Sequence, residues 1–71
     1  MNNSVFKETR KRMKLSQSAL ADELGLSLRM VQYFESGEQP ISRTIEFALR
    51  WICYRDYSLL IPNEYQDELN I

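Results

Sequence analysis

Histidine is absent from the chain, and cysteine occurs once, at Cys53. A lone thiol excludes an intramolecular disulfide, and a zinc site without histidine would have to rely on carboxylates, an unusual ligand set for zinc. We therefore expect no metal and no cofactor. Glycine-rich phosphate loops and nucleophile motifs are missing too, which argues against an enzyme. Because Cys53 falls on an apolar helical stripe, we expect a buried structural thiol.

Long apolar runs are also lacking. No stretch approaches the roughly 18 apolar residues of a membrane-spanning helix, and residues 1–14 are polar and basic, without an apolar signal region. We expect no membrane contact, no secretory leader and a cytoplasmic protein. A content of 44% hydrophobic and 27% charged residues is typical of a folded soluble chain. We assign residues 1–61 to one domain and residues 62–71 to a short acidic tail.

Basic residues are missing from one end of the chain. Residues 56–71 hold four acidic side chains and no lysine or arginine, a charge of -4. Residues 1–55 hold nine basic side chains against six acidic ones, a charge of +3, and the two parts give the net charge of -1. The most basic stretch is 5–14. Its local field suits contact with phosphate, and a solvated helix face explains the same stretch equally well.

What the sequence does contain is a regular series of helix caps and apolar stripes. We expect an all-α fold, a compact bundle of four to five short helices around a central helix-turn-helix. The expected helices cover residues 5–13, 17–24, 28–36 and a fourth stretch after the Ser42 cap. Gly25 suits a left-handed helix end, and Ser27 can cap the next helix only two residues later. Such a turn between two helices defines the helix-turn-helix.

The expected helix 28–36 has two distinct faces at about 100° per residue. Val31 and Phe34 point inward, and Glu35 flanks them. The outer face carries hydrogen-bonding side chains long enough to reach base edges in a major groove. They are Arg29, Gln32, Tyr33 and Ser36.

Residues 16–37 resemble the helix-turn-helix of the Cro/C1-type phage repressor family, and the likeness extends more loosely over residues 5–52. The matching positions are Leu20, Ala21, Leu24, Gly25, Leu26, Val31 and Phe34, with a Leu-Ser-Gln start to the second helix and a Glu-x-Gly end to the third. Small Ala21 lets the two helices approach closely, and Gly25 makes the turn. The resemblance implies a lambda repressor-like fold that binds double-stranded DNA.

The resemblance also implies roles for individual side chains. Base-contacting positions are occupied by Leu28, Arg29, Gln32 and Tyr33, and phosphate-contacting positions by Gln17, Ser27, Arg43 and Lys14. Arg29 is the best candidate for a bidentate contact to guanine. Arg10 and Glu35 match a structural ion pair between the first helix and the end of the third. Leu28 replaces the polar residue that is common at the start of the recognition helix in the family, so one base contact is either apolar or absent. Tyr33 packs either on DNA or on a partner.

A second apolar face on the fourth helix has no obvious cover. It is formed by Phe47, Trp51 and Tyr54, followed along the chain by Leu59, Leu60 and Ile61. Either a short fifth helix folds back over it, or it is a dimer interface. Since the family binds two-fold operators as dimers, we favour a homodimer.

These observations predict a sequence-specific transcriptional regulator. We expect a small dimeric autorepressor from a phage, a mobile element or a bacterial operon, which reads a palindromic operator with helix 28–36. An antitoxin-type protein that holds a toxin with its apolar C-terminal half is the main alternative. A protein-interaction module that keeps the fold without binding DNA is the third.

Overall fold

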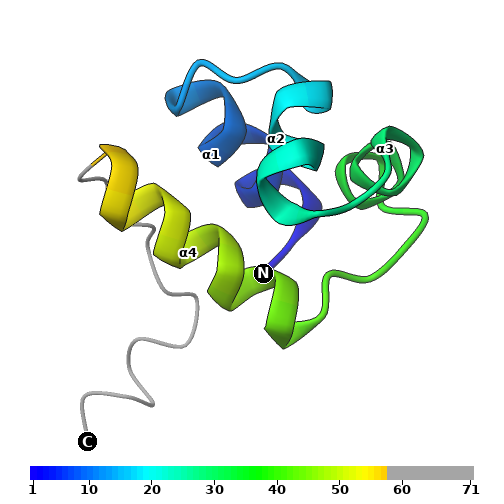
Figure 1. Cartoon of the computed structure of the whole chain (residues 1–71). Helices are drawn as coiled ribbons and strands as arrows, with labels where there is room; N and C mark the ends of the chain where they lie inside the picture. Colours follow the sequence, from blue (N-terminus) through cyan, green and yellow to red (C-terminus); the bar gives the residue numbers. More distant parts are fainter. Residues whose placement is uncertain (58–71) are drawn as a thin grey trace, which may run out of the picture.

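The computed structural model describes residues 1–57, which form four α-helices and, over that range, no strand (Figure 1). The helices are α1 (Asn3–Arg12), α2 (Gln17–Leu24), α3 (Leu28–Ser36) and α4 (Arg43–Tyr57). The predicted all-α fold with a central helix-turn-helix is confirmed. The expected contributions of Leu59, Leu60 and Ile61, the boundary after residue 61 and the fifth helix lie outside the described residues.

The helix α1 begins two residues before the start expected from the sequence. The Asn2 side chain caps it, because its Oδ1 accepts a hydrogen bond from the Val5 amide at 2.8 Å. The helix ends at Arg12 with Met13 as its C-cap, and the following residue, Lys14, takes a left-handed conformation with φ 59°. This turn lets the Leu15 amide donate to the Arg10 carbonyl at 3.3 Å. Residues 13–15 thus redirect the chain into α2.

Three local caps set the start of α2, the end of α2 and the start of α3. The Ser16 hydroxyl accepts from the Ala19 amide at 3.0 Å, and the Ser27 hydroxyl accepts from the Met30 amide at 3.1 Å. Gly25 ends α2 with φ 70°, a region that costs a residue with a Cβ about 1 kcal/mol or more. The expected bounds of α2 and α3 match those of the structure because all three signals are local in sequence.

The core lies where the four apolar stripes meet. Two aromatic rings, Phe6 and Phe34, pack edge to face with centroids 5.6 Å apart and join α1 to α3. The buried hydrophobic residues are Phe6, Met13, Leu20, Ala21, Val31, Phe34, Leu49, Ile52 and Cys53. Burial raises the pKa of the Cys53 thiol, and the nearby Arg12 charge only partly offsets this effect. Leu24, Ile45 and Ala48 are half-buried.

A chain of charges ties the start of α1 to α4. The Met1 amine donates to Glu46 Oε1 at 2.9 Å, and Arg50 Nε donates to Glu46 Oε2 at 3.1 Å. Burial raises the pKa of the Glu46 carboxyl, but the bonds from the amine and Arg50 outweigh burial. The pKa of Glu46 therefore lies below its ordinary value of 4.5.

Candidate nucleic-acid interface

An ion pair between α1 and α3 supports the candidate interface from inside. Arg10 Nε donates to Glu35 Oε2 at 2.6 Å, and Arg10 Nη2 donates to Glu35 Oε1 at 3.1 Å. The third guanidinium nitrogen, Nη1, donates to the Leu15 carbonyl at 2.9 Å. Only 12% of the Arg10 side chain and 4% of the Glu35 side chain are exposed. A two-point, buried contact of this kind fixes the angle of α3 against α1.

The same carboxylate reaches the start of α2. Gln17 Nε2 donates to Glu35 Oε1 at 3.1 Å, and Gln32 Nε2 donates to Gln17 Oε1 at 3.5 Å. The structure thus brings together four residues from three helices. The order of contact is Arg10, Glu35, Gln17 and Gln32.

The outer side of α3 is open to solvent. Leu28 is 43% exposed, Arg29 and Gln32 are exposed, and Tyr33 is half-buried. The Ser36 hydroxyl donates to the Tyr33 carbonyl at 3.2 Å, so it is engaged with its own helix. Val31 and Phe34, on the opposite side, are buried in the core. This division leaves an unobstructed polar strip along α3.

The residues expected to contact phosphate are spread over three turns of the chain. Gln17 is half-buried at the first position of α2, while Lys14, Ser27 and Arg43 are exposed. Lys14 precedes α2, Ser27 precedes α3 and Arg43 begins α4. Three of these four positions therefore lie at or just before a helix start, where free amides and the helix dipole attract anions.

One contact to the candidate interface carried no recognisable sequence signal. Asn3 Nδ2 donates to the main-chain carbonyl of Glu35 at 3.2 Å, which adds a second link between α1 and the end of α3. An asparagine shortly before a helix is usually a helix cap. Asn2 and Asn3 are the same residue type, so the sequence does not show which of them caps α1 and which contacts α3. Only the docking of the helices distinguishes the two.

The expected dimer-interface residues of α4 project away from the core. Phe47, Trp51 and Tyr54 are 58%, 60% and 60% exposed. They lie on the side of α4 opposite to Leu49 and Ile52, as their spacing requires. Three large exposed apolar side chains on one helix face form an unusual surface for a small monomer. We call them the aromatic face.

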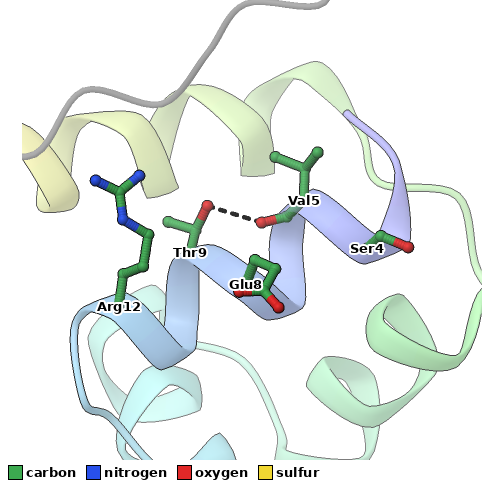
Figure 2. A pocket seen from close by; sticks show the side chains of 5 residues that line it. All are labelled: Ser4, Val5, Glu8, Thr9 and Arg12. Atoms are coloured by element: carbon green, nitrogen blue, oxygen red, sulfur yellow. Dashed lines mark hydrogen bonds between the residues drawn. The ribbon is translucent and has the colours of Figure 1, made fainter.

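A groove of about 240 Å³ lies along α1 (Figure 2). Figure 2 shows Val5 and Arg12 flanking Thr9 on the side of α1 that faces α4. The Thr9 hydroxyl donates to the Val5 carbonyl at 2.7 Å, so this hydroxyl is engaged within its own helix. The lining residues are Ser4, Val5, Glu8, Thr9 and Arg12. None of the residues expected to contact DNA lines this groove.

Two other features are absent from residues 1–57. That part of the chain contains no group of three or more histidine, cysteine, aspartate or glutamate side chains placed to hold a metal ion. Within the same range, no helix has the length and apolar character required to cross a membrane.

The fold and the exposed strip on α3 define a helix-turn-helix protein. A family model described as helix-turn-helix matches residues 6–45, more than half of the chain. The chain belongs to the Cro/C1-type helix-turn-helix family, whose members are DNA-binding transcription regulators and not typically enzymes. Searches of curated proteins and of solved structures found no match.

Proposed function

We propose that the protein is a cytoplasmic, sequence-specific autorepressor that inserts α3 into the major groove of a palindromic operator. One observation carries this proposal: α3 is anchored by the buried side chains of Val31 and Phe34, while Arg29 stays exposed on its outer side. A rigid helix with an exposed arginine is suited to bidentate recognition of guanine. Leu28 and Tyr33 lie beside Arg29 and supply apolar contact to a thymine methyl group.

Phosphate contacts would hold the helix in register. We assign them to Gln17, Ser27, Arg43 and Lys14, which lie at helix starts or in the turn before α2. All nine lysine and arginine residues lie within the described range, although the net charge of the whole chain is -1. Few basic contacts imply modest affinity for random DNA, so binding depends strongly on base contacts and on having two copies.

The first experiment is a fluorescence-anisotropy titration with a duplex covering the promoter of the protein's own gene. It is run at two salt concentrations, beside a scrambled duplex. We expect Arg29→Ala to weaken binding to the promoter duplex at least about tenfold, or 1.4 kcal/mol. Arg55→Ala removes an equal charge from α4, at an exposed pair with Asp56, and should have little effect. Equal binding of both duplexes would refute base reading.

The aromatic face supports a second copy of the chain as partner. We infer a homodimer in which Phe47, Trp51 and Tyr54 pack against the partner, with Leu59, Leu60 and Ile61 as further proposed contacts. Exposures of 58% to 60% on three large side chains are the supporting observation. Half-sites would then lie about one helical turn apart on the DNA.

The same face also supports the alternative function, an antitoxin-type protein that holds a toxin. Sedimentation of the purified protein separates the two. A dimer that persists without other proteins favours the autorepressor. A monomer that forms a stable complex with the product of a neighbouring gene favours the antitoxin.

A further inference from the structure

We propose that Gln32 is a positioning residue that acts through Gln17, and that base reading by polar groups on α3 falls to Arg29. This inference rests on the proposed function and assigns roles within the same interface. It differs from the initial expectation, which placed Gln32 among the base-contacting residues. The contacts of the Gln17 amide carry it.

The buried carboxylate fixes the orientation of the Gln17 amide. Glu35 Oε1 lies 3.1 Å from Gln17 Nε2, and an ionised carboxylate can only accept hydrogen bonds. The nitrogen of the Gln17 amide must therefore face Glu35. Because Arg10 holds both oxygens of Glu35 in place, the carboxylate is a rigid reference point for that amide.

The Gln17 carbonyl oxygen consequently faces α3. Gln32 Nε2 approaches it at 3.5 Å, so the Gln32 side chain leans toward the start of α2. The Gln17 nitrogen has a second hydrogen, which the Glu35 bond does not use. With both ends of the amide held, that hydrogen has a defined direction and is available to a phosphate oxygen.

The remaining outer side chains of α3 offer few polar groups. Leu28 is apolar, Tyr33 is half-buried, and the Ser36 hydroxyl donates to the Tyr33 carbonyl. Arg29 is the sole basic residue of α3, and the acidic residue, Glu35, is buried. If Gln32 is committed to Gln17, discrimination between bases on this helix depends mainly on Arg29.

The test begins with duplexes selected from a randomised pool by the wild-type protein. Dissociation constants are then measured for the selected duplex and for each of its single-base-pair variants. Gln32→Met keeps the shape of the side chain and loses the hydrogen bond. We expect it to weaken binding by the same factor for every duplex, about two- to tenfold. The double variant Gln17→Met/Gln32→Met should bind no more weakly than Gln17→Met alone. Arg29→Ala should instead flatten the discrimination at one base pair.

Two outcomes of the binding experiment overturn the proposal. In the first, Gln32→Met changes the preference at a particular base pair. In the second, the losses from Gln17→Met and Gln32→Met simply add. Matching melting temperatures for the variants show that the comparison concerns folded protein.

A DNA-free measurement separates this proposal from the proposed function. We expect Gln32→Met to shift the side-chain amide resonances of Gln17 in the ¹⁵N NMR spectrum of the free protein. Gln39→Met, at an exposed glutamine in the loop before α4, is the matched control and should leave them unchanged. If the Gln17 side-chain amide resonances are unchanged in Gln32→Met, the inference is wrong. Failure of all duplexes to bind would refute the function, while the spectrum still decides the contact.

Discussion

Glu35 carries a charge in a place where only 4% of its side chain reaches solvent. Removing a carboxylate from water costs several kcal/mol unless donors replace the water. Here Arg10 and Gln17 supply three hydrogen bonds to its two oxygens. The buried ion pair therefore holds α1, α2 and α3 in one arrangement, and each partner depends on the other.

We expect Arg10→Met to lower the free energy of unfolding by about 3 kcal/mol, because it leaves the Glu35 charge buried without its main partner. Urea unfolding followed by circular dichroism measures the change. The double variant Arg10→Met/Glu35→Leu removes both charges and should lose much less than the two single variants together.

The exposed pair Arg55 and Asp56 is a matched control for that experiment. Its nitrogen and oxygen are also 2.6 Å apart, but 49% and 35% of the two side chains are exposed. Arg55→Met should change the free energy of unfolding by no more than about 0.5 kcal/mol. An equal loss for Arg10→Met and Arg55→Met would contradict the role given to burial.

Lys14 combines an unfavourable conformation with a proposed function. Its φ of 59° suits glycine better than a residue with a Cβ. We expect Lys14→Gly to raise the free energy of unfolding by about 0.5 kcal/mol and to reduce the slope of log affinity against log salt by about 0.9. Lys11→Gly, inside α1, should lower stability by about 1 kcal/mol. Greater stability with an unchanged salt slope would remove Lys14 from the phosphate contacts.

At the scale of helices, the bounds of α2 and α3 followed from the sequence because their signals are local. Ser16 and Ser27 cap the helix starts, and Gly25 ends α2. The start of α1 did not follow, because Asn2, Asn3 and Ser4 can all serve as caps. The choice depends on a long-range contact, the bond from Asn3 to the Glu35 carbonyl.

The candidate site shows the same division between local and long-range information. The family resemblance pointed to Arg10 with Glu35 and to the exposed residues of α3. It did not indicate that Gln17 and Gln32 touch, since they lie on different helices and neither has a charge that would suggest a partner. Likewise, the bond between Met1 and Glu46 joins residues 45 positions apart and leaves no periodic pattern.

That link between α1 and α4 predicts a dependence on pH. The folded-state pKa of Glu46 is lowered, so its contribution to stability is complete above the ordinary value of 4.5 and is lost as the pH falls through the folded-state value. We expect the free energy of unfolding to decline over this range and Glu46→Gln to make the decline shallower. If the free energy of unfolding declines equally at low pH in wild type and variant, Glu46 does not contribute to the pH dependence of stability.

For the whole molecule, the homodimer proposed above predicts that a second copy covers the aromatic face. Trp51 is the only tryptophan in the sequence and is 60% exposed, so its fluorescence reports directly on this surface. If a second copy packs there, its emission should shift to shorter wavelength as the protein concentration rises. Tyr54→Lys should abolish the shift, while Gln39→Lys, an equal charge change in an exposed loop, should preserve it. Emission independent of concentration would contradict the homodimer.

The alternation along α3 has a consequence for how such a protein changes over evolutionary time. Val31, Phe34 and Glu35 maintain the fold, whereas Leu28 and Arg29 project from it and are exposed. Substitutions at the exposed positions leave the core and the ion pair intact. A lineage with this architecture can therefore acquire a new operator one side chain at a time and remain folded at every step.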